Sequence, residues 1–508
     1  MKLLLIGHEE RYAVEQLQLA LFPLEPMEPV TATCDYDPRN IHYFDGDGAL
    51  SVLTRGDMWL SALTFVFIGG KQHSSTVHLL TAEETVSSRR RILKQSYYEA
   101  ALPFLKKAPA WGALSGVRPT KLTTRCLKAG MSDEETIREM EQTYFVTPRR
   151  AKLSLDCSKY TMHALEQMEP SDVSLYVGIP FCPTRCAYCS FVSKTIGKNT
   201  DLMEPYLQAL HRELRITGKL MATSGKTVRT IYIGGGTPTT LTSVQMKELL
   251  DCIRESFDLS RCIEFTVEGG RPDTLDQEKL TVIAQNGADR MSINPQSMVD
   301  SVLTASRRPH TAADVERSYR QAVNAGFDAI NMDLIAGLPT DDFDGFRHSL
   351  DTTIALSPAN ITVHTLAIKK GADLYERREG LSSDEEVSRM VDYAEEALRG
   401  AGYEPYYLYR QKYMSGSFEN VGWCRPGTAC LYNIYMMEEL HTIISVGGGG
   451  MNKVNLPDGR LQRFHNPKFP QQYIDMIDDV LRQKEELFAL MNADASAAVE
   501  SGKGKVES

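Results

Sequence analysis

Apolar stretches of strand length alternate with amphipathic helical stretches through the middle of the chain, between about residues 170 and 400. The expected strands are Leu175–Ile179, Thr230–Ile233, Ile263–Val267, Asp289–Ile293, Ala329–Asp333 and Asn360–His364. The expected helices lie between them, at Met203–Met221, Ser243–Ser256, Leu275–Asn286, Ala312–Ala325 and Asp342–Ala355. Strands and helices that alternate in this way form a parallel sheet with right-handed crossovers. Six such units predict an α/β fold built on an open, partial (β/α)6 barrel.

The pattern of the first 165 residues is different, and it predicts a small α+β domain. A strand at the LLLI run is followed by a short helix over Arg11–Leu21, and Ser132 with Glu135 forms a capping-box signature for a helix that reaches Tyr144. The other expected elements are strands near Ala49–Thr54, Trp59–Ile68 and Thr76–Leu80, a helix over Glu83–Lys107, and a helix from Thr147 to about Met168. We therefore predict three parts: 1–165, a core over 166–400, and a C-terminal α/β extension over 401–508.

The C-terminal extension contains an unusual density of tyrosine. Two cations accompany the tyrosines Tyr403, Tyr406, Tyr407, Tyr409 and Tyr413, namely Arg410 and Lys412. Aromatic rings beside cations can cover a flat carboxylated ligand, but the same residues are typical of an exposed edge strand. Further on, Gly447 to Gly450 predicts a tight turn, and Tyr473 to Leu490 predicts a last helix, with a frayed tail after Met491.

Composition and charge narrow the class of protein. The 508-residue chain has a formal net charge of −10, which disfavours a general nucleic-acid binder. Its ten cysteines do not form a secreted disulfide pattern. The longest apolar runs, such as Leu60 to Gly69, are too short to span a bilayer, and no signal peptide precedes the first strand. These features predict a cytoplasmic protein.

Three cysteines stand close together after the first strand of the core. Cys182, Cys186 and Cys189 have three and two residues between them, and Pro180 separates them from the strand. A structural zinc site needs four ligands, and no second cysteine pair lies nearby. A [4Fe–4S] cluster held by three cysteines keeps one iron free for a ligand that is not protein. The alternatives are three buried thiols or a partial zinc site.

Polar and glycine residues also follow the other expected strands of the core. In a (β/α) barrel the chemistry gathers at the carboxyl ends of the strands, so these residues are expected to lie on one rim. They are Gly234 to Thr239, Glu268, Asn294 to Gln296, Asp333, and His364 with Ala367. Glycines let a ligand touch the backbone directly, so the rim predicts a large cofactor and substrate site.

These motifs carry a family resemblance. The cysteine spacing, with an aromatic residue before the last cysteine, and the GGGTPT phrase resemble the radical S-adenosylmethionine superfamily. LYVGIPFC, IYIGGGTPT and INMDLIAGLP resemble its oxygen-independent coproporphyrinogen III oxidase branch, and WGALSGVRPTK and FENVGW resemble the group of coproporphyrinogen dehydrogenases called HemZ. Three features depart from the family's usual pattern: Gly178 and Phe191 stand where the well-studied oxidases have His and Cys, and Glu268 is followed by Gly-Gly-Arg rather than the usual acidic or Asn-Pro pair.

The resemblance implies two cofactors: a [4Fe–4S] cluster, and S-adenosylmethionine in one or two copies. It implies that Cys182, Cys186 and Cys189 bind the cluster. It implies that one S-adenosylmethionine contacts Tyr176, Tyr188, Gly235, Gly236, Thr237 and Glu268, and that a second contacts Gln296, Arg308, Asp333 and Ala367. No protein side chain is expected to act as a catalytic acid, base or nucleophile.

The implied activity is anaerobic oxidative decarboxylation of coproporphyrinogen III to protoporphyrinogen IX, in porphyrin and heme biosynthesis. It requires a tetrapyrrole substrate, an external electron donor and cations for the substrate carboxylates, for which the candidates are Arg118, Lys121, Arg410 and Lys412. Arg118 and Lys121 belong to a loop that either holds an anion or is a structural turn filled by Trp111. The alternative functions are a heme-binding chaperone and a radical enzyme that acts on another tetrapyrrole. The candidate axial heme ligands are His310, His364, His441 and His465.

Overall fold

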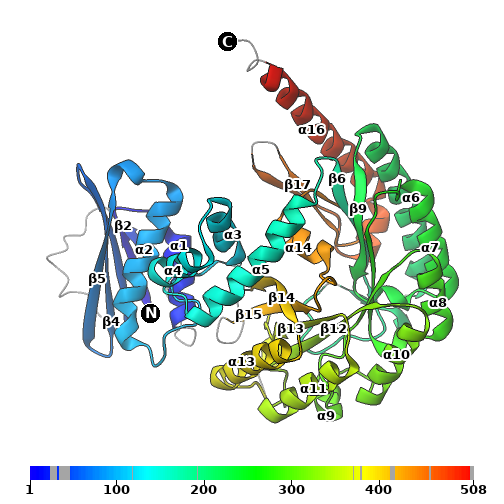
Figure 1. Ribbon diagram of the computed structural model, residues 1–508, viewed down its shortest axis with the longest axis horizontal. Coiled ribbons are helices and arrows are strands. Elements are labelled where there is room, and N and C mark those ends of the chain that lie inside the picture. The colour runs from blue at the N-terminus through cyan, green and yellow to red at the C-terminus, as the bar shows by residue number, and fades with distance from the viewer. Residues whose placement is uncertain are drawn as a thin grey trace. The chain divides into compact units, whose positions relative to one another are not determined.

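The structure is a computed structural model that describes residues 1–22, 31–33, 46–116, 118–191, 193–198, 200–369, 371–377, 380–411, 418–456 and 459–503. The chain divides into two compact units, one made of Met1–Leu155 and one made of most residues from Asp156 onward (Figure 1). Helix α5 (Pro148–Glu166) contains the boundary between them. The division into three parts that the sequence suggests stays a prediction.

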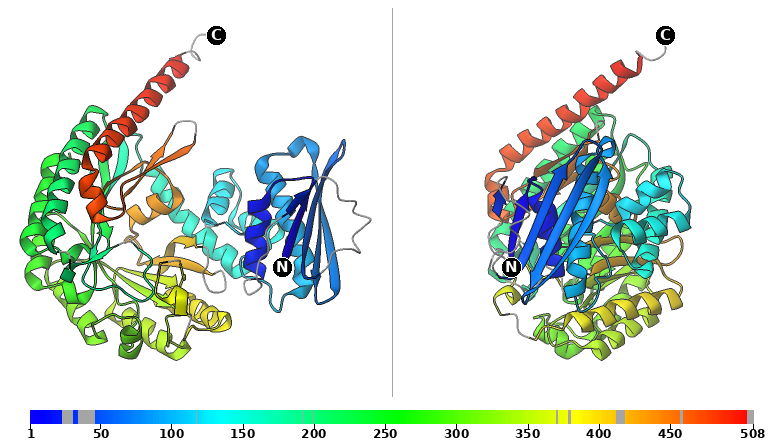
Figure 2. Two further views of the ribbon diagram at one scale, coloured as in Figure 1. Left: turned by 180° about the vertical axis from the view of Figure 1, so that it is seen from behind. Right: turned by 90° about the vertical axis from the view of Figure 1, so that its left-hand side faces the viewer.

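The N-terminal unit is a five-stranded sheet with helices against it (Figure 2). The strand order is β2-β1-β3-β4-β5, in which β1 is parallel to β2 and β3, and the remaining pairs are antiparallel. The strands are β1 (Lys2–Ile6), β2 (Thr31–Thr33), β3 (Gly48–Arg55), β4 (Trp59–Ile68) and β5 (Lys71–Leu80), and the helices are α1 (Arg11–Leu21), α2 (Val86–Ala101), α3 (Thr120–Lys128) and α4 (Asp133–Tyr144). Apolar side chains of α1 and α2 pack with those of β1, β3 and β4 in one core. The predicted α+β fold is confirmed.

Two helix predictions in this unit have different outcomes. The capping box is present, because the Glu135 N–H donates to Ser132 Oγ and the Ser132 N–H donates to the Glu135 carboxylate, at 3.2 and 2.8 Å. The helix predicted to reach Lys107 is wrong at its end. α2 stops at Ala101, and a single 3-10 turn over Leu102–Phe104 follows, in which Pro103 lies. Proline lacks the N–H that would continue the α-helical hydrogen bonds.

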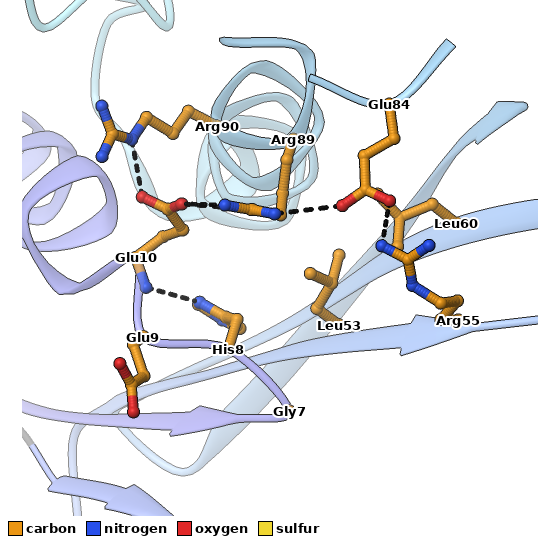
Figure 3. A pocket seen from close by; sticks show the side chains of 10 residues that line it. All are labelled: Gly7, His8, Glu9, Glu10, Leu53, Arg55, Leu60, Glu84, Arg89 and Arg90. Atoms are coloured by element: carbon orange, nitrogen blue, oxygen red, sulfur yellow. Dashed lines mark hydrogen bonds and ion pairs between the residues drawn. The ribbon is translucent and has the colours of Figure 1, made fainter. Parts of the chain in front are cut away.

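A cavity of about 490 Å³ lies beside the loop between β1 and α1 (Figure 3). A chain of ion pairs crosses it: Glu10 pairs with Arg89 and Arg90, and Glu84 pairs with Arg89 and Arg55. Each arginine that lines the cavity thus faces a carboxylate. The charges compensate one another and give this cavity no clear preference for an anion.

The second unit contains the predicted core. Six parallel strands lie side by side in sequence order: β6 (Asp172–Ile179), β9 (Thr227–Gly235), β10 (Glu264–Gly270), β11 (Arg290–Ile293), β12 (Ala329–Ala336) and β13 (Asn360–Thr365). The connecting helices include α6 (Met203–Thr223), α7 (Ser243–Ser256), α8 (Gln277–Gln285), α10 (Ala312–Asn324) and α11 (Phe343–Leu356), which line the outer side of the curved sheet (Figure 1). The sheet is open at both edges. The partial (β/α)6 barrel is therefore confirmed.

The C-terminal residues extend the same sheet on both sides. β14 (Glu404–Arg410) and β15 (Glu419–Cys424) add antiparallel strands beside β13. β16 (Ile443–Gly447) lies parallel to β6, and β17 (Met451–Asn455) and β18 (Leu461–His465) continue from it. The last helix is two helices, α15 (Pro470–Asp475) and α16 (Ile477–Lys503), so the expectation of a frayed tail after Met491 is wrong.

The two faces of the barrel sheet differ in chemistry. In β12, Ile330 and Met332 belong to the apolar core under the helices. Asn331 and Asp333 alternate with them and therefore point to the inner side of the curve. Residues paired across strands share a face, so Ser292 of β11 lies beside Asn331. The inside of the barrel is accordingly polar, as a binding site requires.

A short helix, α14 (Leu431–Glu438), covers the inside at the amino ends of the strands. The Glu264 carboxylate, at the start of β10, accepts the N–H groups of Leu431 and Tyr432 at 2.7 and 2.9 Å. Arg290, at the start of β11, lies 3.9 Å from the same carboxylate. These buried groups therefore satisfy one another at the amino ends of the strands.

Candidate functional site

The three cysteines occupy the loop at the carboxyl end of β6. Phe181 and Cys182 form a two-residue strand that pairs with Lys194 and Thr195, and the Cys189 N–H donates to the Cys186 carbonyl at 3.2 Å. All three side chains are partly exposed, which excludes three buried thiols. Among the residues that the structure describes, no three His, Cys, Asp or Glu side chains are arranged to hold a single metal ion. An iron–sulfur cluster is larger than one ion and needs thiols that stand farther apart.

Hydrogen-bond donors surround these thiols. Thr237 Oγ1 donates to Cys182 Sγ at 3.5 Å, and Arg308 Nη1 donates to Cys186 Sγ at 3.7 Å. Burial raises the pKa of Cys189, and the neighbouring Cys186 and Cys182 raise it further. Thiols that lie this close together disfavour one another's ionisation. A positively charged metal cluster that replaces their three protons would remove this repulsion and would be bound strongly.

The glycine phrase after β9 lies directly against the cysteine loop. The Gly236 N–H donates to the Ile179 carbonyl at 2.8 Å, and the Thr237 N–H donates to the Phe181 carbonyl at 2.7 Å. A Cβ atom at Gly236 would stand 2.4 Å from that carbonyl oxygen and 3.0 Å from Cys182 Sγ. Gly235 has a φ of +118°, a conformation that favours glycine. Glycine is therefore required for the two loops to approach.

The structure explains why glycine replaces His at position 178. A Cβ at Gly178 would stand 2.8 Å from the Gly448 carbonyl oxygen, and a Cβ at Gly447 would stand 2.3 Å from the Gly178 carbonyl oxygen. Tyr206 fixes this crossing, because its hydroxyl donates to the Gly178 carbonyl at 2.6 Å and accepts the Gly448 N–H at 2.8 Å. The extra strand β16 thus packs against β6 where a side chain at 178 would stand.

Two carboxylates face each other at the carboxyl ends of the middle strands. Burial raises the pKa of Glu268 to about 8, and the charge of Asp333 contributes to the increase. Burial also acts to raise the pKa of Asp333, but the hydrogen bond and charge of His364, together with the Asn331 amide, outweigh it and hold that pKa below its usual range. Glu268 is therefore mostly a neutral carboxyl group at neutral pH, while Asp333 is ionised.

His364 connects Asp333 to the tyrosines of β14. Its Nε2 lies 3.7 Å from the Asp333 carboxylate, and its Nδ1 lies 3.4 Å from the Tyr409 hydroxyl. Asn331 Nδ2 donates to the other oxygen of Asp333 at 2.8 Å. These contacts orient the carboxylate within the site.

Arg308, and not Arg307, points into the site. The Arg308 guanidinium is buried and donates to the carbonyls of Gly270 and Asn294, at 3.3 and 2.6 Å, and to the Tyr188 hydroxyl at 3.2 Å. Arg307 points outward and pairs with Asp373. One cation therefore links the cysteine loop to the ends of β10 and β11.

Buried polar atoms show that the site suits a polar ligand. Gln296 has a φ of +68°, and its backbone bridges to β12 through the Asp333 carbonyl at 2.8 Å. Within the described part of the chain, neither its Oε1 atom nor the Tyr432 hydroxyl has a hydrogen-bond partner. An unpaired buried polar atom costs about 1–3 kcal/mol, and a bound polar ligand relieves that cost.

Aromatic rings line the inner face next to the cysteine loop. The rings of Tyr176, Tyr232 and Tyr432 are nearly parallel, with centroids 6.3 Å apart for the first pair and 4.7 Å apart for the second. Glu268 is close enough to Tyr176 and Tyr232 to help raise the pKa of each, although burial is the larger cause. Tyr176 is among the site residues predicted from the sequence, whereas Tyr232 and Tyr432 are not.

The contacts above join nearly all the predicted site residues into one group. Ala367 lies two residues beyond β13, at the same end of the sheet. β14 is an edge strand of the sheet, but Tyr406 and Tyr407 within it and Tyr403 just before it are buried, which disfavours the alternative of an exposed strand. Lys412 and Tyr413 lie outside the described residues.

Other candidates from the sequence are buried or lie elsewhere. His310 and His441 are buried with pKa values lowered by burial to about 4, and they contact Arg308 and Ser174 respectively. His465 is exposed on β18. Trp111 is buried within the N-terminal unit, which favours the structural turn over an anion-holding loop. Arg118 and Lys121 belong to that same unit.

The chain is similar to proteins of the radical SAM superfamily. A model of the radical SAM superfamily matches residues 176–352. The oxygen-independent coproporphyrinogen-III oxidase-like protein HemZ of Bacillus subtilis is 39% identical over 388 residues, which cover 74% of this chain and 77% of that protein. The heme chaperone HemW of Escherichia coli is 28% identical over 302 residues, which cover 59% of this chain and 75% of that protein.

A solved structure shows the same fold. Coproporphyrinogen III oxidase (HemN) from Escherichia coli, a radical SAM enzyme, matches with a TM-score of 0.50 at 22% sequence identity, over 63% of this chain and 72% of that chain. No helix in the described ranges has the length and apolar character to span a membrane.

The barrel and the three-cysteine loop thus define a protein of the radical SAM class, whose cofactors are a [4Fe–4S] cluster and S-adenosylmethionine. Within this class, the chain belongs to the family of oxygen-independent coproporphyrinogen-III oxidase-like proteins that contains HemZ.

Proposed function

We propose that this protein catalyses the oxygen-independent oxidative decarboxylation of coproporphyrinogen III to protoporphyrinogen IX. The main support for this proposal is the similarity to the HemZ protein, which extends over about three quarters of both chains. The hydrogen bonds between the cysteine loop and the glycine loop support it further. Two propionate groups become vinyl groups: each loses a hydrogen atom to the organic radical, passes one electron to an external acceptor and releases its carboxyl group as carbon dioxide. An external donor supplies the electron that starts each turnover. The protein acts in the cytoplasm, where reducing conditions protect a partly exposed cluster.

The proposed roles of the residues come from the family resemblance, and the closeness of these residues to one another supports them. Cys182, Cys186 and Cys189 hold the cluster, and Gly235, Gly236 and Thr237 present backbone to the methionine end of the cofactor. Tyr188 would lie beside the adenine, Tyr176 would pack near the cluster and its cofactor, and Glu268 would accept a hydrogen bond from the cofactor. The cluster and S-adenosylmethionine together supply an organic radical that abstracts hydrogen. The described groups orient the reactants and exclude water.

A second S-adenosylmethionine is proposed for the other side of the same group. Its contacts are Gln296, Arg308, Asp333 and Ala367. The unpaired Gln296 Oε1 and the ionised Asp333 supply acceptors that suit ribose hydroxyl groups. Arg308 already donates to protein carbonyls and to Tyr188, so its charge acts mainly by opposing the negative charge of the cysteine loop.

The test is anaerobic incubation of the reconstituted protein with S-adenosylmethionine, a low-potential reductant and coproporphyrinogen III, followed by mass analysis. The expected products have lost one and two carbon dioxide units, in proportion to the 5′-deoxyadenosine formed. The Cys186→Ala variant is the control and forms neither. Formation of 5′-deoxyadenosine with unchanged coproporphyrinogen would contradict the proposed substrate, while leaving the radical chemistry in place.

A heme chaperone is the second candidate, because HemW proteins are also relatives of this chain, including one of Bacillus subtilis that is 36% identical over 206 residues. Of the proposed axial ligands, His364 lies beside the carboxylate of Asp333, an arrangement that orients imidazole ligands at metals. Titration of the purified protein with heme distinguishes the functions. Tight heme binding that is lost in His364→Ala, combined with no decarboxylation, favours the chaperone. A tetrapyrrole product of another mass favours a different radical reaction.

A further inference from the structure

Four tyrosines form a continuous series from the site to the surface of the second unit. Tyr409 and Tyr407 are stacked with centroids 6.3 Å apart, Tyr407 and Tyr406 are 4.8 Å apart, and Tyr406 and Tyr160 are 6.4 Å apart. The first three belong to β14, and Tyr160 belongs to α5. We refer to these four residues as the tyrosine series.

The backbone is adapted to this arrangement. Consecutive residues of a strand normally point to opposite faces, but the register between β14 and β15 shifts between Pro405 and Tyr407. The shift lets the adjacent rings of Tyr406 and Tyr407 come together. The Tyr407 ring also fills the space over Gly422, where a Cβ would stand 1.8 Å from ring atom Cε1. Any larger residue at 422 would displace the second ring of the series.

Each end of the series has a group that can exchange a proton. At the inner end, the Tyr409 hydroxyl lies 3.4 Å from His364 Nδ1, and His364 contacts Asp333. At the outer end, the Tyr160 hydroxyl donates to the Glu404 carboxylate at 2.6 Å, in an exposed position. A tyrosine that loses an electron becomes a strong acid, so a base at hydrogen-bond distance makes its oxidation easier.

The hydroxyl groups are not needed for packing. Phenylalanine would fill the same volume, whereas a buried hydroxyl costs free energy unless it is hydrogen-bonded. Here the hydroxyl groups have partners: Asn433 donates to that of Tyr406 at 3.3 Å, and Thr362 contacts that of Tyr407. Burial raises the pKa of all four tyrosines, so each keeps its proton until it is oxidised.

We propose that the tyrosine series carries an oxidising equivalent from the radical site to the protein surface when turnover fails to reach substrate. This inference rests on the radical chemistry of the proposed function, but not on the identity of the tetrapyrrole. A radical left in the site would otherwise attack the residues around it. The series gives that radical a route out.

The Tyr409 hydroxyl would give its hydrogen atom to the organic radical, which leaves a closed-shell product and a tyrosyl radical at Tyr409. One electron then moves inward from Tyr160 through Tyr406 and Tyr407, and Tyr409 regains a proton through His364. Tyr160 passes its own proton to Glu404, which releases it to water, and His364 takes up a proton from water in return. A thiol in solution finally gives one hydrogen atom to the Tyr160 radical, and the thiol becomes a thiyl radical.

The first experiment uses the cluster-loaded protein with S-adenosylmethionine and reductant in D₂O, without tetrapyrrole. Only exchangeable positions carry deuterium, so a hydrogen atom taken from a hydroxyl appears as deuterium in 5′-deoxyadenosine. Wild-type protein is expected to give deuterated product, and Tyr409→Phe is expected to lose it. Undeuterated product from wild-type protein would overturn the proposal. If no 5′-deoxyadenosine forms, the proposed function fails, and the second experiment decides the inference by itself.

The second experiment oxidises surface tyrosine with a laser-flashed ruthenium complex and follows the tyrosyl radical by electron paramagnetic resonance, with thiol present. In wild-type protein, part of the radical moves inward, where thiol cannot reach it, and decays slowly. Tyr406→Phe is expected to lose this slow part. The matched control is Tyr393→Phe, since Tyr393 also donates to a carboxylate, Asp351 at 2.7 Å, but lies outside the series. Identical decay in wild-type protein and Tyr406→Phe would refute the route.

Discussion

The glycine crossing between β6 and β16 permits a quantitative test of what holds the cysteine loop in place. Gly447 has a φ of +85°, and a Cβ there would stand 2.3 Å from the Gly178 carbonyl oxygen. Gly449 has a φ of +75°, but a Cβ there would meet nothing within 4 Å. Alanine at either position bears the cost of the left-handed backbone, and only alanine at 447 also collides with β6. A comparison of the two variants therefore separates the cost of the left-handed backbone from the cost of the collision with β6.

The expected magnitudes follow from these two costs. A residue with a Cβ in the left-handed region costs roughly 1–2 kcal/mol, so Gly449→Ala should lower the free energy of unfolding by that amount. Overpacking against a rigid backbone costs typically about 1–3 kcal/mol more, so Gly447→Ala should lose about 2–5 kcal/mol in total. The displaced residue, Gly178, stands four positions before Cys182. We therefore also expect less iron to bind in Gly447→Ala.

The assay is urea denaturation of the cluster-free variants, together with iron and sulfide content after anaerobic reconstitution. Gly449→Ala should bind iron like wild-type protein, because its side chain points into open space. Equal unfolding free energies and equal iron content in the two variants would refute the idea that this crossing positions the cysteine loop.

Three further results are expected. Cys186→Ala should lose both the visible absorption of the cluster and the formation of 5′-deoxyadenosine. Cys262→Ala, which alters a cysteine outside the loop, should keep both. A cluster retained in Cys186→Ala would contradict the three-cysteine site. Asp333→Asn should keep the cluster but lower the product yield, measured by mass analysis, and an unchanged yield would remove Asp333 from the site. The pKa of Glu268 is raised to about 8, so a cationic ligand that pairs with its carboxylate must displace a proton below that pH. The affinity for this ligand, measured by equilibrium dialysis, should therefore rise by up to about tenfold per pH unit below pH 8 and then level off. Glu268→Gln should abolish this dependence, and a wild-type affinity that does not change with pH would contradict the pairing.

The core of the fold is predictable because neighbouring residues in the sequence determine each of its strands and helices. Each strand is an apolar run bounded by turn residues, and most of the connecting helices have a side-chain cap, such as Thr242 with Gln245 before α7. The placement of β16 beside β6 is not predictable in this way. It joins residues far apart in sequence, and no local pattern states that Ile443 will pair with Ser174. The full length of α16 is not predicted, because the small residues after Met491 are typical of a frayed chain end.

The site is predictable where chemistry follows a strand directly. The cysteines, the glycines after β9, and Glu268 and Asp333 all lie within or just after strand ends. Gln296 shows the limit of such reasoning. Its left-handed backbone and unpaired amide oxygen are properties of the folded chain that its sequence neighbours do not reveal.

Tyr232 and Tyr432 are not predicted as site residues because their placement depends on how distant parts of the chain pair. The alternation within each strand already marks which residues share a face, since Thr230 and Tyr232 of β9 alternate with the buried Ile231 and Ile233. Sequence alone does not supply the register that sets Tyr232 beside Tyr176. A slip of one residue would turn Tyr232 toward the helices and bring an apolar side chain to the inner face. The apolar residues under the helices therefore fix the register, and through it they place an aromatic wall next to the cysteine loop.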